Sequence, residues 1–528
     1  MSAFDPSSLN SVSEFFQFCQ PSSATLLACL PEASLCALAI LALVFDVVCT
    51  RAPVKAAASV VIRAALIVLF ICAVAGAFPQ LDPDCGQLFF FAAIGQLTTP
   101  IFIACAFFAI NLAGIVRSRE KNSEISAPAT THLILVATAA ASLLLKSSNF
   151  VAFFVLLETL TVCLYALVGS NRQSPYSLEA GVKYLIAGGV SGGLMLFGIV
   201  LLYGGMISNG NVGDFGDSLG YFSIFKFLTQ NPENLLGIVG AALVLAGVMF
   251  KLGVFPMQFW IPDVYQGAPT HVTFFLATVS KATGFFLFLA MLSVFSGIRE
   301  ILIPVLLGCA LISIVYANLT ALGQRNVKRL LGLSGVSHAG YLALGALAAF
   351  SLMEPGVPND MFCLTIVVAY LIVYIVTIYP IFSVMARMPQ TDDALQNFDD
   401  YRALSKKNPF LAGTLAFGLG SLAGIPPTVG FIAKLGLLYV LFYAGFYWTI
   451  AVMLACVVAG IYYYFGWFRA AFSGGEDGGK AEAETAVAGT AVAGTAEYLP
   501  VRLCSRVVLV LFSASLVLGS LVYWAVLS

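Results

Sequence analysis

Apolar segments of at least 18 residues recur almost from one end of this 528-residue chain to the other. Runs of that length are typical of helices that cross the hydrocarbon core of a membrane, which is about 30 Å thick. They do not alternate in polarity, as the strands of a membrane β-barrel do. Only 10% of the residues are charged, against about 25% in soluble domains. We therefore expect an all-α polytopic membrane protein.

About fourteen such segments can be distinguished. The segment at 409–441 is too long for one straight crossing and contains Pro426-Pro427, so we expect a broken helix there. The predicted spans are 25–49, 56–78, 88–115, 130–146, 149–170, 178–204, 235–256, 269–296, 301–321, 329–352, 361–387, 409–441, 446–472 and 503–525.

The distribution of lysine and arginine orients these spans. With the N-terminus outside, 17 basic residues fall on inner connections and three, Lys146, Lys226 and Arg299, on outer ones. This bias predicts that both termini lie on the outer side, which is periplasmic in a bacterial inner (plasma) membrane, with the mitochondrial inner membrane as the organellar alternative. Because the net charge is near zero, nothing indicates nucleic acid as a partner.

Two further features of the sequence carry no predicted chemistry. Residues 473–502 contain a repeated Ala-Val-Ala-Gly-Thr motif and are predicted to form a low-complexity inner loop. The 12 cysteines are scattered through apolar runs without a C-x-x-C pair, which is typical of small buried side chains rather than of metal ligands or disulfides.

Four lysines and a glutamate stand inside the apolar segments. A lysine at the bilayer centre costs about 2.5–3.5 kcal/mol, so we expect each to face protein or water. Ionisable groups in such positions typically mark a proton or ion path. The five residues are Glu158, Lys183, Lys251, Lys281 and Lys434.

Prolines accompany two of the lysines. Lys251-Leu252-Gly253 precedes Pro256, and Lys434-Leu435-Gly436 follows Pro426-Pro427. Interrupted helices in corresponding positions of two halves point to a transport site. Burial disfavours the charged form of a lysine and a nearby carboxylate favours it. A lysine between these influences can change charge near neutral pH, so a water-bridged series could relay protons.

Each residue also has a structural interpretation. Lys183 is close to a helix entry and could extend its ammonium to the surface. Glu158 could form a structural salt bridge. His338 lies well inside an apolar span and could be either a packing residue or a member of the relay.

Three motifs together identify a family. The segment 260–270, Trp-Ile-Pro-Asp-Val-Tyr-Gln-Gly-Ala-Pro-Thr, is followed by Ala-Thr-Val-Ser-Lys at 277–281. A second block spans 326–341 and includes His338, and a third runs from Leu-Ala-Gly-Ile-Pro-Pro at 422 to Lys434. Over roughly residues 130–470 the chain resembles the antiporter-like membrane subunits of respiratory complex I.

Within that family the chain is most similar to the N-type subunit, the counterpart of mitochondrial subunit 2. The block Ser-Leu-Glu-Ala-Gly-Val-Lys-Tyr at 177–184 is N-like, and Lys434 stands where the M-type subunit has glutamate. The chain ends just after its fourteenth predicted span, whereas the L-type subunit continues into a lateral helix.

The resemblance implies an architecture. It predicts two inverted five-helix repeats with broken helices, at 130–296 and 301–472. An N-terminal three-helix segment at 1–129 and a C-terminal transmembrane helix at 503–528 flank them.

The resemblance also implies roles for the charged residues. Glu158 and Lys251 would form the acid–lysine pair of the first half-channel, which Lys183 would modulate. Lys281 would connect the halves, and Lys434 would be the terminal lysine of the second half-channel. His338 matches a position near the central hydrophilic axis. His271 is a departure, because many relatives have proline there.

The implied function is that of a proton-translocating membrane subunit of an NADH:quinone oxidoreductase. No cofactor is expected in this chain; NADH, FMN, iron–sulfur clusters and quinone would belong to partner subunits. The implied partners are a neighbouring M-type subunit, small K- and J-type subunits and membrane lipids. The alternatives are an Mrp-type cation/proton antiporter subunit, a hydrogenase-linked membrane subunit, and a structural scaffold with salt-bridged lysines.

Overall fold

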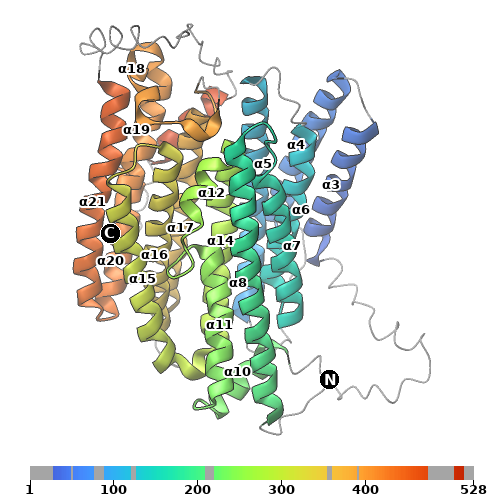
Figure 1. Cartoon of the computed structure of the whole chain (residues 1–528), viewed down its shortest axis with the longest axis vertical. Coiled ribbons are helices and arrows are strands. Elements are labelled where there is room, and N and C mark those ends of the chain that lie inside the picture. The colour runs from blue at the N-terminus through green and yellow to red at the C-terminus, as the bar shows by residue number, and fades with distance from the viewer. Residues whose placement is uncertain are drawn as a thin grey trace.

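The computed structural model describes residues 28–48, 52–76, 89–119, 127–208, 219–353, 360–388, 392–473 and 505–516. In this part of the chain, helices run side by side in one bundle (Figure 1), and β-structure is limited to two isolated bridges. Eleven helices are long and apolar enough to cross a membrane, and four shorter apolar helices accompany them. The predicted all-α polytopic class is confirmed, while the count of fourteen crossings stays a prediction. The low-complexity loop lies almost wholly outside the described residues.

Three helices precede the first predicted repeat: α3 (Leu30–Val48), α4 (Ala52–Val74) and α5 (Phe89–Arg119). α3 and α4 occupy one flank of the bundle (Figure 1), where α3 packs against α6 (Ala127–Lys146) and α4 against α5. Only 17% of the apolar window of α4 is buried within this chain. Its remaining apolar surface is suited to lipid or to a neighbouring subunit.

The rest of the bundle falls into two successive groups of helices. The first comprises α6, α7 (Phe150–Val168), α8 (Pro175–Ser208), α10 (Tyr221–Gln230), α11 (Leu235–Leu252), α12 (Ile261–Gly267), α13 (Thr270–Phe275), the π-helical η2 (Leu276–Ser280) and α14 (Lys281–Val294). The second comprises η3 (Ser296–Ile298), α15 (Arg299–Ala321), α16 (Val327–Ser351), α17 (Asp360–Met385), η4 (Asp393–Leu395), η5 (Phe398–Tyr401), α18 (Leu404–Lys407), α19 (Pro409–Ala423), α20 (Val429–Tyr443) and α21 (Tyr447–Phe472).

One helix in each group begins with an asparagine cap. Asn149 caps α7 by accepting a hydrogen bond from the Val151 amide, and Asn326 caps α16 by accepting from the first amides of that helix. Each asparagine also forms an isolated antiparallel bridge, Asn149 with Gly220 and Asn326 with Asn397. The first bridge adjoins α10 and the second lies near α18, and these two helices are at opposite ends of the bundle (Figure 1).

Both predicted proline breaks separate helices. α11 ends at a left-handed Gly253 (φ 82°) before Pro256, and α19 ends at a left-handed Gly424 (φ 79°) before Pro426. Glycine is favoured at such positions because it has no Cβ. The predicted break within 409–441 is thus confirmed. The two Lys-Leu-Gly triplets are not equivalent, however, because Lys251 precedes its break while Lys434 follows its break, inside α20.

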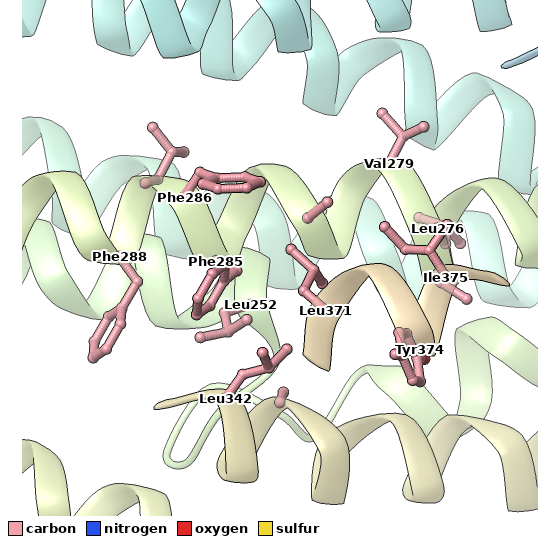
Figure 2. Close-up of a cluster of buried hydrophobic side chains, with 14 of the residues drawn as sticks. Leu252, Leu276, Val279, Phe285, Phe286, Phe288, Leu342, Leu371, Tyr374 and Ile375 are labelled. Carbon is pink, nitrogen blue, oxygen red and sulfur yellow. The ribbon is translucent and has the colours of Figure 1, made fainter. Parts of the chain in front are cut away.

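Two helices form the centre of the bundle. The continuous stretch α13–η2–α14 and helix α16 are buried along their whole apolar length, as expected of helices that are apolar on all sides. Figure 2 shows apolar side chains of this stretch, such as Leu276 and Phe285, gathered with Leu342 of α16 and Leu371 of α17. The ionisable groups of the centre are therefore embedded in a close apolar packing.

Candidate functional site

Lys251 lies in the last turn of α11 and is 3% exposed. Its Nζ donates a hydrogen bond to Oγ1 of Thr161 on α7 at 2.8 Å. Glu158 is one helical turn from Thr161 and lies within electrostatic range of Lys251. In the described part of the chain these two residues make no direct ion pair. The predicted acid–lysine pair is thus placed in one region, and Lys251 bonds to a threonine on the helix of Glu158 that the sequence reasoning missed.

A row of glycines on α8 makes room for the polar side chains of α7. A Cβ at Gly192 would lie 2.5 Å from Oε1 of Glu158. One turn earlier, the hydroxyl of Tyr165 lies in the space that a Cβ at Gly188 would need. Small residues let membrane helices approach closely, and here they also fit a carboxylate and a phenol into the contact.

Lys281 begins α14 directly after the π-helical turn and is 2% exposed. Its Nζ donates a hydrogen bond to the main-chain carbonyl of Gly335 on α16. The same ammonium lies 5.4 Å from the centre of the Tyr374 ring, a cation–π contact. Lys281 therefore touches α16 and α17, helices of the second group, although it belongs to the first.

His338 lies on α16 and is 5% exposed. Its Nδ1 shares a hydrogen bond with the Tyr370 hydroxyl at 2.6 Å, and its Nε2 lies 3.5 Å from the Tyr464 hydroxyl. The charges of Lys281 and Lys434 both act on this ring. His338 thus has a hydrogen-bonding neighbour at each ring nitrogen and lies within electrostatic range of two lysines, and both interpretations from the sequence stay open.

Lys434 is 6% exposed and reaches back across the break between α19 and α20. Its Nζ donates to the carbonyls of Leu422 at 2.8 Å and Ala423 at 2.9 Å. These are carbonyls of the last turn of α19, which have no partner within their own helix. The negative end of the helix dipole also favours a cation there.

Lys183 is placed differently from the other three lysines. Its side chain is 47% exposed and pairs with Glu179 at 2.7 Å and with Asp263 at 2.9 Å. Arg329 reaches the other oxygen of Asp263 at 2.7 Å. Partial burial raises the pKa of Asp263, but the hydrogen bond from Lys183 and the charge of Arg329 outweigh that effect and hold the pKa below its usual range. The structure therefore brings Lys183 to Asp263 and not to Glu158.

Several partners of the ionisable groups are hydroxyl residues that the sequence reasoning did not select. The sequence could have indicated them, because each hydroxyl residue lies three or four positions from another polar residue of the site and so shares its helix face. These pairs are Glu158 with Thr161, Ser334 with His338, and Tyr370 with Tyr374. Ser334 and Tyr464 share a close hydroxyl–hydroxyl contact.

Other buried hydroxyls have no hydrogen-bond partner among the described residues. In this region they include those of Tyr165 and Tyr374. Buried polar atoms without protein partners are normally satisfied by ordered water. Tyr165 lies on the helix of Glu158 and Tyr374 contacts Lys281, so the site offers positions for bridging water. The described residues contain no group of three or more His, Cys, Asp or Glu side chains that could hold a metal ion.

Comparison with known proteins defines the class. Residues 147–459 match the family model of the NADH:quinone oxidoreductase/Mrp antiporter transmembrane region. The fold is similar to a chain of respiratory complex I from Thermus thermophilus (TM-score 0.71, 24% identity, covering 94% of this chain and 98% of that chain). It is equally similar to a chain of the Mrp complex from Dietzia sp. (TM-score 0.71, 18% identity, covering 95% and 96%). Fold and family thus define an antiporter-like integral membrane protein.

A curated relative narrows this class. NADH-quinone oxidoreductase subunit N 1 of Opitutus terrae is 48% identical over 383 residues, which cover 72% of this chain and 74% of the relative. The chain belongs to the family of NADH-quinone oxidoreductase subunit N. The resemblance inferred from the three sequence motifs is confirmed.

Proposed function

We propose that this chain is a proton-translocating membrane subunit of an NADH:quinone oxidoreductase and that it relays protons along an axis of glutamate, lysine and histidine side chains. Family membership supports the general activity. The observation that carries the relay is the environment of three buried lysines, Lys251, Lys281 and Lys434, whose described hydrogen bonds go to uncharged oxygens.

Two other lysines of the chain can be compared with these three. Lys146 and Lys328 are also buried, and each is paired with a carboxylate, Glu32 at 2.6 Å and Asp393 at 3.1 Å. In such a pair the buried carboxylate compensates the lysine charge, and removal of one partner would leave the other uncompensated. A lysine held by a hydroxyl or a carbonyl can lose its proton without that cost. This difference argues against a scaffold in which salt bridges hold all the buried lysines.

The order of the groups follows from their contacts. Glu158 and Lys251 stand at one end, and Lys281 crosses from the first group of helices to the second. His338 lies within electrostatic range of both Lys281 and Lys434, which stands at the break of the second group. In the mechanism we propose, a charge that moves along this series changes the proton affinity of its neighbour and so gates proton uptake and release. Lys183 with Asp263 would act at the partly exposed margin.

The same proposal covers arrangement and partners. The recurrence of the asparagine caps and of the glycine–proline breaks supports two inverted repeats. The charge bias supports termini on the outer side. The exposed apolar surface of α4 suits lipid or a neighbouring membrane subunit, for which M-, K- and J-type subunits are the candidates. NADH, FMN, iron–sulfur clusters and quinone are assigned to other subunits.

An Mrp-type cation/proton antiporter is the second candidate, because the fold matches a chain of an Mrp complex as well as one of complex I. The 48% identity to a subunit N favours the oxidoreductase. The two are separated by measuring whether NADH oxidation by the purified complex in sealed vesicles drives proton uptake in sodium-free buffer. An absolute requirement for sodium would favour the antiporter.

The test of the relay uses the assembled complex in proteoliposomes. Lys251→Ala and Lys281→Ala should each lower proton uptake coupled to quinone reduction by at least about tenfold, since a positioned proton-transfer group contributes roughly 10²–10⁴-fold. Lys226→Ala, on α10 outside the site, is the matched control. Normal pumping by both assembled variants would refute the relay.

A further inference from the structure

His271 is the second residue of α13 and is 5% exposed. Neither ring nitrogen has a hydrogen-bond partner among the described residues. An imidazole always carries at least one N–H donor and, when neutral, one acceptor. Leaving such atoms unsatisfied costs roughly 1–3 kcal/mol each. A small polar partner such as water would satisfy them.

A buried ion pair adjoins this histidine. Oδ2 of Asp393 accepts hydrogen bonds from the Thr270 amide at 2.7 Å and from the Thr270 hydroxyl at 2.5 Å. It therefore caps the N-terminus of α13, the helix that contains His271. Lys328 donates to the same oxygen at 3.1 Å and to the Ala268 carbonyl at 2.6 Å. Asp393 and Lys328 both act electrostatically on the His271 ring.

Helices α5, α7 and α17 also pack against α13, and none of their ionisable groups is among the charges that act on His271. From α17, Tyr379 packs on Phe274 rather than on His271. From α5, the Cys105 thiol interacts with Thr278, two turns further along the helix. The charged groups that act on His271 are therefore Asp393 on η4 and Lys328 on α16.

The cluster is close to one end of the bundle. Arg329, the residue after Lys328, is 36% exposed, so the surface is one residue away. The loop that carries Asp393 leads directly into α18, which Figure 1 shows at that end of the bundle. His271 therefore lies near the exposed margin at this end of the bundle.

The cluster and the centre share one helical stretch. His271 and Lys281 are ten residues apart, about 15 Å along a helix axis. The π-helical turn lies between them, and π-helical turns are frequent at functional sites. Ser280, 1% exposed, lies against the Tyr184 hydroxyl just before Lys281.

We propose that His271, flanked by Asp393 and Lys328, binds a proton at the entrance of a second access route, which leads along α13 and the π-helical turn to Lys281. The ligand of this site is the proton, delivered by water. The inference rests on the proposed relay, in which Glu158 and Lys251 stand at one end, and adds a second point of proton entry. His271 receives a proton from the water side and passes it to water on the Lys281 side.

The test uses the assembled complex in proteoliposomes, with quinone reduction and proton uptake recorded together. His271→Gly should lower proton uptake at least about tenfold, as expected for the loss of a positioned proton-transfer group. Added imidazole should restore a large part of it, because it can occupy the space left by the ring. His271→Gln should show the same loss without rescue, since it fills that space. His132→Gln, on α6, is the matched control.

Normal proton uptake by either His271 variant would overturn the inference. A loss in His271→Gly that imidazole does not restore would also overturn it, because the ring would then have only a packing role. If the glycine variant does not assemble, the outcome for His271→Gln decides. Lys281→Ala, measured in parallel, separates the relay from the entry route. Normal pumping by Lys281→Ala would refute the relay itself. Impaired pumping by Lys281→Ala with normal pumping by the His271 variants would refute only the entry route.

Discussion

Lys281 and Gly335 meet where the two groups of helices join: the lysine ammonium bonds to the glycine carbonyl. A Cβ at position 335 would lie 2.9 Å from that ammonium and 3.6 Å from the Tyr374 hydroxyl. The absence of a side chain at this one position of α16 therefore decides where the central lysine sits.

Gly335→Ala should displace the Lys281 ammonium and lower coupled proton uptake by about 10- to 100-fold, because small misplacements of a reacting group can cost up to about 100-fold. Gly308→Ala is the control, since a Cβ there meets nothing within 4 Å. Proton uptake and quinone reduction by the two assembled variants are compared. Equal activities would show that Lys281 tolerates the shift.

Gly192→Ala should crowd the Glu158 carboxylate, which lies 2.5 Å from the position of the added Cβ. We expect at least about a tenfold loss of coupled proton uptake if Glu158 is a proton-transfer group. The neighbouring Gly193→Ala adds the same methyl group to the same helix where nothing lies within 4 Å. The prediction is contradicted if the two variants pump alike.

Thr161→Val removes the oxygen that accepts the hydrogen bond from Lys251. A hydrogen bond to a charged group contributes about 1.5–3 kcal/mol, so the protonated lysine loses about that much stabilisation and proton uptake should fall roughly 10- to 100-fold. Thr161→Ser should keep the activity because it keeps the hydroxyl. Thr159→Val, on the exposed side of the same helix, is the control. A serine variant as impaired as the valine variant would argue that packing matters rather than the hydroxyl.

The pair of Glu32 and Lys146 tests whether a lysine that is paired with a carboxylate stabilises the fold. Oε1 of Glu32 accepts from Lys146 at 2.6 Å and from Ser142 at 2.5 Å, tying α3 to α6. Lys146→Met or Glu32→Gln alone should lower the free energy of unfolding by about 3–5 kcal/mol, because one buried charge is left unpaired. The double variant should recover much of that loss. Thermal unfolding in detergent measures it, and additive losses would deny the coupling.

Asp263 predicts a pH dependence. The pKa of Asp263 lies below its usual range because Lys183 and Arg329 outweigh partial burial. A lowered pKa stabilises the fold above the pKa of the unfolded chain, about 3.9, and this contribution disappears as the pH falls through the folded value. The stability advantage of the native chain over Asp263→Asn should therefore be full at pH 7 and shrink below about pH 4. An advantage that stays constant down to pH 3 in thermal unfolding would contradict this assignment.

The membrane class, the break at Pro426 and the burial of Lys251, Lys281 and Lys434 could be predicted from sequence. Apolar length defines a spanning helix, a proline interrupts one, and a lysine deep in an apolar run must find a polar environment. Each of these inferences depends on a local property of the chain.

The partners of the lysines could not be predicted. α16 is buried on every side, so its sequence pattern does not show which face meets Lys281. Main-chain acceptors such as the carbonyls of Leu422 and Ala423 leave no trace in residue type. For Lys183 an exposed position was one of the two interpretations of the sequence, but its pairing with Asp263 on another helix could not be predicted.

Lys281 and Lys434 both bond to main-chain oxygens. No substitution at 335, 422 or 423 can delete a carbonyl oxygen; it can only add bulk or alter the path of the backbone. The two contacts are therefore encoded in helix trajectory rather than in residue chemistry. An engineered subunit could change most side chains around these two lysines and retain both anchor points, provided that the glycine at 335 and the turn after 423 keep their course.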